Sequence, residues 1–227
     1  MNHIYYTGIF SLIIQLVTGI IDFYAINLTI PSSFILIREL LIIELIVQII
    51  EFSFYIWMLF KFSMIKNITS FRYYDWMLTT PTMLITFMFF LNFLSNQEQN
   101  IISDSFLTEF KKQWKLVLNV ILLNWGMLIC GYLGEKNVFS YLTTTLVGFV
   151  PFLLMFYIIY KNFAIHTSQG RKIFWYFSGI WAIYGIAAIM PYKIKNSMYN
   201  ILDIFSKNFF GLFLSYVLYK VSFNVSK

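Results

Sequence analysis

Long apolar stretches that alternate with short polar ones dominate this chain of 227 residues. A bilayer core about 30 Å thick is crossed by a helix of about 20 mostly apolar residues. The polar stretches divide the chain into seven segments of about this length. The segments cover residues 5–28, 34–60, 71–94, 113–133, 137–160, 171–191 and 198–223. This pattern predicts an all-α membrane protein, a single domain of seven transmembrane helices over residues 1–227.

The composition supports a membrane protein and excludes several other classes. Hydrophobic residues make up 59% of the chain and charged residues only 11%, whereas about a quarter of a typical soluble domain is charged. The net charge of +6 is spread over the polar stretches, so we expect no nucleic-acid partner. No nucleophile with a nearby base and no metal-ligand spacing stand out, so we expect neither an enzyme nor a metal site.

The positions of Lys and Arg in the short connections predict the orientation in the membrane, because inner loops carry more of them. With the N-terminus outside, the basic residues at the inner side are Arg38, Lys111, Lys112, Lys115, Lys161, Arg171, Lys172, Lys220 and Lys227. Those at the outer side are fewer: Lys61, Lys66, Lys136, Lys193 and Lys195. This excess favours an outer N-terminus and an inner C-terminus.

The last segment, which reads NILDIFSKNFFGLF, contains a lysine too deep to reach water. Lys207 lies about ten residues from the helix start, near mid-bilayer at about 1.5 Å per residue. Asp203 lies four residues earlier, on the same helical face. A buried neutral amine can condense with an aldehyde to form a Schiff base. The alternative is a Lys–Asp pair that only fixes helix packing.

The third segment, FRYYDWMLTTPTML, supplies a second carboxylate, Asp75, which could lie across the bundle from Lys207. Arg72, one turn away, could keep Asp75 and Asp203 ionised. These two segments resemble those of the microbial (type 1) rhodopsins, which bind retinal through a lysine of the seventh helix. The residues that match the third-helix pattern are Arg72, Tyr73, Asp75, Trp76, Thr79, Thr80 and Pro81. Those that match the seventh-helix pattern are Asp203 and Lys207.

The resemblance implies a role for each matching residue. Lys207 would hold all-trans retinal covalently, as a Schiff base in the core of the bundle. The counterion complex would consist of Asp75, Asp203 and Arg72. The retinal pocket would be lined by Trp76, Thr80, Trp181 and Tyr184.

Two further helices depart from the family pattern. The sixth reads WAIYGIAAIMPY, with Gly185 where many members have proline and Ala188 where they have a second tryptophan. We therefore expect a wider pocket near the retinal ring. In the fourth helix, Asn124 stands where pumps of the family often have an aspartate, and we expect it to pair with Thr80.

The second segment carries a polar stripe, because Glu44, Gln48 and Glu51 are spaced by four and three residues along one helical face. Such a stripe could simply join helices by hydrogen bonds. Rows of carboxylates beside a water-filled gap also form cation pathways, and the stripe resembles the acidic second helix of channelrhodopsins. The implied ion pathway consists of Ser11, Gln15, Glu44, Gln48, Glu51 and Asn208, with Ser11 and Gln15 as partners of Glu44 and Asn208.

Thr86 bears on what the bound retinal would drive. It stands eleven residues after Asp75, where outward proton pumps of the family usually have a carboxylate. The chain therefore most resembles the small viral rhodopsins that are similar to channelrhodopsins. This resemblance implies a light-gated channel for monovalent cations or protons, in the plasma membrane or another membrane of a host cell, with lipid around it and a homo-oligomer as an option. The alternatives are a light-driven outward proton pump, with Asp75 as acceptor, and a sensory photoreceptor.

Overall fold

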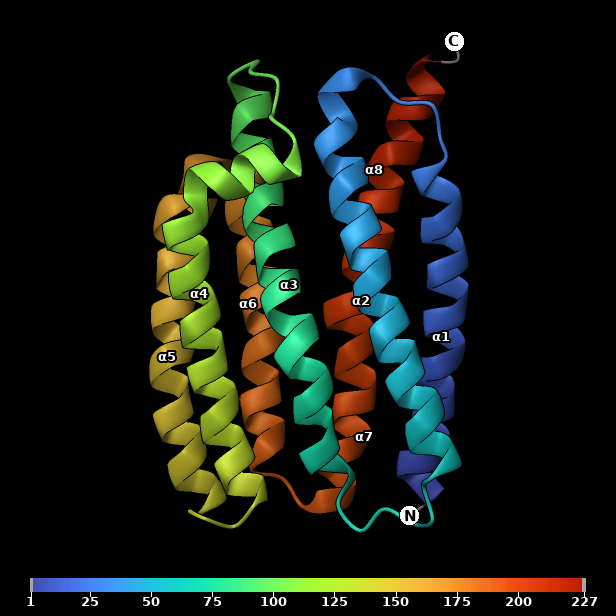
Figure 1. Ribbon diagram of the computed structural model, residues 1–227, viewed down its shortest axis with the longest axis vertical. Helices are drawn as coiled ribbons and strands as arrows, with labels where there is room; N and C mark the ends of the chain where they lie inside the picture. Colours follow the sequence, from blue (N-terminus) through green and yellow to red (C-terminus); the bar gives the residue numbers. More distant parts are fainter. Residues whose placement is uncertain (1, 226–227) are drawn as a thin grey trace.

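The structure, a computed structural model, describes residues 2–225 and consists of long helices that run side by side (Figure 1). The first five α-helices are α1 (Asn2–Ile26), α2 (Ile35–Phe60), α3 (Ile68–Glu98), α4 (Phe106–Glu135) and α5 (Tyr141–Asn162). The others are α6 (Ser168–Ala188), α7 (Tyr192–Asp203) and α8 (Phe209–Val225). Five π-helical residues, Ile204–Asn208, join α7 to α8. We call them the π segment. The three pieces form one rod, so the predicted bundle of seven helices is confirmed.

Three of the helices begin at side-chain caps that the sequence supplies. Asn67 accepts a hydrogen bond from the Ser70 amide at the start of α3. Ser140 accepts one from the Thr143 amide at the start of α5, and Thr167 one from the Gly170 amide at the start of α6. Such caps satisfy amide groups that have no partner within the helix. They fix where these helices enter the bundle.

The connection between α3 and α4 is shorter than the sequence suggested. The apolar pattern placed helix ends at residues 94 and 113, whereas α3 continues to Glu98 and α4 begins at Phe106. The carboxylate of Glu39 accepts a hydrogen bond of 2.7 Å from the Phe106 amide and so caps α4. The added turns are rich in polar residues, because they extend beyond the apolar stretches of α3 and α4. A prediction based on hydrophobic stretches therefore could not include them.

Five of the rods are long and apolar enough to cross a membrane: α1, α3, α4, α5 and the rod of α7, the π segment and α8. The remaining two, α2 and α6, are 26 and 21 residues long. Despite its apolar composition, α2 contains two fully buried carboxyl groups, those of Glu44 and Glu51. The outer surface of the bundle carries many exposed large hydrophobic side chains, as expected of a protein surrounded by lipid.

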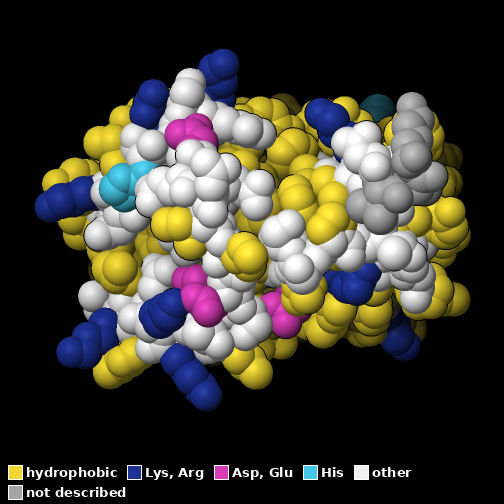
Figure 2. Space-filling view, turned by 90° about the horizontal axis from the view of Figure 1, so that it is seen from above, with side chains coloured by type: hydrophobic (Ala, Val, Ile, Leu, Met, Phe, Trp, Pro, Cys, Tyr) yellow, Lys and Arg dark blue, Asp and Glu magenta, His cyan; other side chains and the backbone are white. Residues whose placement is uncertain are grey.

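The end of the bundle that contains the C-terminus carries Lys and Arg side chains around its rim (Figure 2). At the opposite end, Lys195 was expected in an exposed loop, and this expectation is wrong. Lys195 lies in α7, is buried, and contacts Glu135 of α4 at 2.6 Å. Removing it from the basic residues at the N-terminal end increases the asymmetry that favours an inner C-terminus.

The interior of the bundle has an apolar part and a polar part. Aromatic side chains of α3, α6 and α8 pack together, with Phe87 stacked on Phe177 at 4.1 Å between ring centroids and Phe210 edge-on to both. Buried polar side chains instead gather where α1 and α2 meet the rod of α7, the π segment and α8. The buried polar residues include Lys207, Asp75 and Asp203, the residues that the sequence singled out.

Candidate functional site

Lys207 lies in the π segment and is 1% exposed. Its Nζ atom is 2.9 Å from Oδ2 of Asp75 in α3 and 4.0 Å from Oδ1 of Asp203. The arrangement of Asp75 across the bundle from Lys207 is therefore the one that the sequence suggested. A π-helical turn inside an α-helix often marks a functional site, and here it carries the buried amine.

A third carboxyl group lies beside this amine. Oε1 of Glu51 is 3.6 Å from the Lys207 Nζ atom. Neither carboxyl oxygen of Glu51 has a hydrogen-bond donor among the described residues. The sequence placed Glu51 on the stripe of α2 but gave no sign of this contact, because it depends on how α2 packs against the π segment.

Arg72 is fully buried, and residues of α2 and α7 contact its guanidinium group. Its Nη1 atom lies 3.3 Å from Oδ2 of Asp203. It also donates hydrogen bonds to the Tyr55 hydroxyl and to the side-chain oxygens of Asn196 and Asn200. We expected Arg72 to join both aspartates. Among the described residues it forms an ion pair with Asp203 alone, because its α7 partners hold the guanidinium toward that rod.

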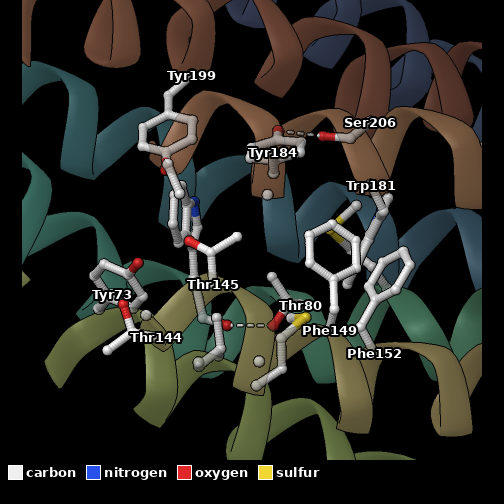
Figure 3. A pocket seen from close by; sticks show the side chains of 18 of the residues that line it. Tyr73, Thr80, Thr144, Thr145, Phe149, Phe152, Trp181, Tyr184, Tyr199 and Ser206 are labelled. Carbon is white, nitrogen blue, oxygen red and sulfur yellow. Dashed lines mark hydrogen bonds between the residues drawn. The ribbon is translucent and has the colours of Figure 1, made fainter. Parts of the chain in front are cut away.

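Two tyrosine hydroxyls donate to Asp203. Tyr55 of α2 contacts Oδ2 at 2.6 Å, and Tyr184 of α6 contacts Oδ1 at 2.7 Å. Tyr184 also shares a hydrogen bond with Ser206 of the π segment (Figure 3). Charge-assisted hydrogen bonds of this kind are short and strong. Tyr184 was predicted only as a pocket residue. Tyr55 could have been found, because it continues the stripe of α2.

An apolar cavity extends from Lys207 between α3, α4, α5 and α6 (Figure 3). The four predicted pocket residues all line it: Trp76, Thr80, Trp181 and Tyr184. The amide of Asn124 donates to the Thr80 hydroxyl at 2.8 Å, so this predicted pairing is confirmed. An apolar cavity that ends at an amine beside carboxylates suits a long apolar aldehyde, and the residues present therefore fit retinal.

Phe149 lies close to Gly185 in the cavity. Phe149 of α5 lines the same cavity, and its ring would lie only 2.6 Å from a Cβ atom added at Gly185. The space that the missing proline leaves is thus partly filled from a neighbouring helix. A single sequence does not reveal this exchange, because Phe149 lies on a different helix.

A second polar cluster lies nearer the end of the bundle with the C-terminus. The Asn208 amide donates to the Thr18 hydroxyl at 3.1 Å, and Thr18 contacts Gln48 at 3.4 Å. Gln48 in turn donates to Asp22, which also accepts a hydrogen bond of 2.6 Å from Ser215. The sequence analysis did not predict Thr18 and Asp22 as site residues. Their spacing could have indicated them, because Ser11, Gln15, Thr18 and Asp22 recur every three or four residues along one face of α1, as the stripe does along α2.

The expected partners of Glu44 and Asn208 were wrong. Gln15 donates to Ser11 at 3.1 Å, and among the described residues neither bonds to Glu44 or Asn208. Thr18, one turn further along α1, takes the contact with Asn208. Thr86 of α3 donates to Glu44. The pathway residues therefore come together on the same side of the bundle, with different pairings.

Comparisons with known proteins agree with this geometry. A family model described as bacteriorhodopsin-like protein matches residues 3–221. The viral rhodopsin OLPVRII is 26% identical, with a TM-score of 0.82, and the match covers 96% of this chain and 98% of that one. No curated protein matches the chain.

Two more distant structures share the fold. A blue light-absorbing proteorhodopsin from Med12 is 20% identical, with a TM-score of 0.73 and 96% of each chain covered. Xanthorhodopsin, described as a light-driven ion pump with dual chromophore, is 15% identical, with a TM-score of 0.72, and the match covers 98% of this chain and 94% of that one. Because the family model spans nearly all of the sequence, this chain belongs to the bacteriorhodopsin-like family, that of the microbial rhodopsins.

Proposed function

We propose that this protein binds retinal at Lys207 and acts as a light-gated cation channel. Its path would run between α1, α2 and the rod of α7, the π segment and α8. One observation carries the proposal: a series of polar side chains, buried except for the half-buried Thr7 at its end, follows these helices and passes Lys207, whose chain neighbour Asn208 continues it. From the end with the N-terminus, the series is Thr7, Asn200, Arg72, Asp203, Lys207, Asn208, Thr18, Gln48, Asp22 and Ser215.

The residues around the apolar cavity would hold the cofactor. Bound to the Lys207 amine, retinal would supply light absorption and a change of shape at the centre of the bundle. Trp76 and Trp181 give the cavity flat apolar walls. Asp75, at 2.9 Å from the Lys207 nitrogen, would balance a positive charge there.

Lys207 lies between the two halves of the polar series. A change of shape of retinal at Lys207 would therefore act on the contacts of both halves. On the side of the N-terminus, Asp203 connects to Arg72 and Asn200. On the other side, Asn208 follows Lys207 directly in the chain and contacts Thr18. A displacement at Lys207 therefore reaches both halves through neighbouring residues. The series is closed in this conformation, since its members from Thr18 to Ser215 are at most 3% exposed.

The chemistry of the series suits cations. Several buried oxygens on the same helices have no hydrogen-bond donor among the described residues: Gln15 Oε1 of α1, Glu44 Oε2 and both carboxyl oxygens of Glu51 of α2, and Asn208 Oδ1 of the π segment. Buried acceptors nearly always have a partner, and a cation with its water would provide one. Carboxyl groups along a pore also favour cations over anions.

The test is the photocurrent of Glu44→Gln in voltage-clamped cells, with Glu98→Gln, an exposed residue at the end of α3, as the matched control. We expect Glu44→Gln to change the size or reversal potential of the current, whereas Glu98→Gln behaves as wild type. Identical currents in wild type and Glu44→Gln would overturn the assignment of Glu44 to the path.

One contact favours a second candidate, an outward proton pump. The Thr86 hydroxyl donates to Glu44, so α2 brings a carboxyl group to the position where pumps of the family usually carry their own. Asp75 would accept the proton from the Lys207 nitrogen. A pump gives current of one sign at every voltage and loses it in Asp75→Asn. A sensory photoreceptor, the third option, gives no current.

A further inference from the structure

Asp22 is a buried carboxyl group of the polar series to which no role of its own has been assigned. It lies in α1, four residues before the helix ends at Ile26, and is 0% exposed. Its two oxygens are held from different helices, by the Ser215 hydroxyl of α8 at 2.6 Å and by the Gln48 amide of α2. An ionisable group inside a membrane protein is expensive to bury and usually has a function.

The packing around Asp22 closes the bundle at this level. A Cβ atom added at Gly211 of α8 would collide with Asp22 and Gln48. Only glycine therefore lets α8 come this close to α1 and α2. Asp22, Gln48 and Ser215 from the three helices are buried and hydrogen-bonded to one another at this level.

Side-chain contacts also connect Asp22 to Asn208, the residue that follows Lys207 in the chain. Gln48 uses its amide nitrogen for Asp22, and its amide oxygen contacts the Thr18 hydroxyl. Thr18 accepts a hydrogen bond from Asn208, the residue that follows Lys207. A shift of Asn208 would thus remove a donor from Thr18 and change the hydrogen bonding of Gln48.

We propose that Asp22 is the inner gate of the cation path, held shut by Gln48 and Ser215 and released through Thr18 and Asn208. This inference rests on the proposed channel function. It assigns the last carboxyl group that a cation meets before the inner surface. When Gln48 turns away, the Asp22 carboxyl group becomes available to a cation in the path, and its charge then contributes to selectivity.

The first experiment compares Asp22→Asn with Asp104→Asn, an exposed aspartate in the α3–α4 connection. Asp22→Asn is expected to shift the reversal potential and to slow the closing of the current after light, whereas Asp104→Asn changes neither. The absorption maximum in the dark should equal that of wild type, because Asp22 is not one of the three carboxyl groups within 4.0 Å of the Lys207 nitrogen. A wild-type reversal potential and closing time in Asp22→Asn would overturn the proposal.

The second experiment tests the connection without relying on current. The light-minus-dark infrared spectrum of wild type should contain a carboxyl band that Asp22→Asn lacks. Thr18→Val keeps Asp22 and the shape of residue 18 but removes the hydroxyl that links Gln48 to Asn208. We expect the Asp22 band to disappear from the difference spectrum of Thr18→Val as well, while the bands of Asp75 remain.

The two readouts separate the inference from the proposed function. If the wild-type current never reverses, the channel function fails, yet the infrared bands still report whether Asp22 responds to light. An Asp22 band that persists in Thr18→Val would overturn the connection. Should Asp22→Asn fold poorly, Ser215→Ala removes one hydrogen bond from the same carboxyl group. It should then shift the frequency of that band, and an unshifted band would contradict the proposal.

Discussion

The Lys207 nitrogen has three carboxyl groups within 4.0 Å, those of Asp75, Glu51 and Asp203. Arg72 contributes a second positive charge through its contact with Asp203. Two cations thus face three carboxyl groups in a buried site, where an unbalanced charge is costly. The ion pairs in this cluster therefore balance charges that could not be buried singly.

Lys207→Ala should abolish the visible absorption that appears when all-trans retinal is added to membranes containing the protein. The reason is that the cavity ends at this amine and at no other buried lysine. Lys220→Ala, an exposed lysine of the same rod, is the control and should bind retinal normally. Visible absorption in Lys207→Ala would show that the cofactor is attached elsewhere.

Asp75→Asn should move the absorption maximum to longer wavelength more than Glu51→Gln does. Excitation moves positive charge away from the Lys207 nitrogen, so a nearby anion stabilises the ground state more than the excited state. Asp75 lies at 2.9 Å and Glu51 at 3.6 Å. Absorption spectra of the two variants at one pH decide the order. A larger shift in Glu51→Gln would mean that Glu51 is the main counterion.

At the scale of helices, the buried ion pair between Glu135 and Lys195 joins α4 to α7 at 2.6 Å. Glu135→Gln should lower stability by about 3–5 kcal/mol, because it leaves a buried cation without its partner. Thermal unfolding of the purified protein measures this. The control is Asp104→Asn, which removes an exposed partner of Lys112 and should not change the melting temperature. An unchanged melting temperature in Glu135→Gln would contradict the buried pair.

Gly211 is where α8 packs against α1 and α2, and a methyl group there would collide with Asp22 and Gln48. Gly211→Ala should therefore destabilise the protein by about 1–3 kcal/mol, the usual cost of overpacking. Gly179 of α6 has no atom within 4 Å of an added Cβ. Gly179→Ala should leave the melting temperature unchanged or raise it, because alanine favours helix. Equal effects of the two substitutions would argue against this packing.

Helix number and type followed from the hydrophobic pattern, because each helix needs a long apolar stretch. The extra turns at the ends of α3 and α4 did not, since they are polar and are held by contacts such as that of Glu39 with the Phe106 amide. The π segment could not be foreseen either. It depends on how Lys207 and Asn208 are held by α1, α2 and α3.

At the scale of the whole molecule, the bundle combines an aromatic core with a polar seam. The seam consists of the buried polar side chains where α1 and α2 meet the rod of α7, the π segment and α8. The buried Glu44 and Glu51 side chains of α2 lie on this polar side of the bundle. Residues that match a family motif, such as Asp75 and Lys207, could be brought together from the sequence. The spacing along α1 marks Thr18 and Asp22 as polar positions, but their partners on α2 and α8 depend on how these helices pack.

The most direct test of the proposed function is a voltage-clamp recording of illuminated cells that express the protein with all-trans retinal. Membrane potential is stepped at two external cation concentrations. A channel along the polar seam predicts a current that changes sign with voltage, at a potential that moves with the cation gradient. A current of one sign at every voltage would contradict the channel and favour the pump, with Glu44 beside Thr86 as the internal carboxyl group.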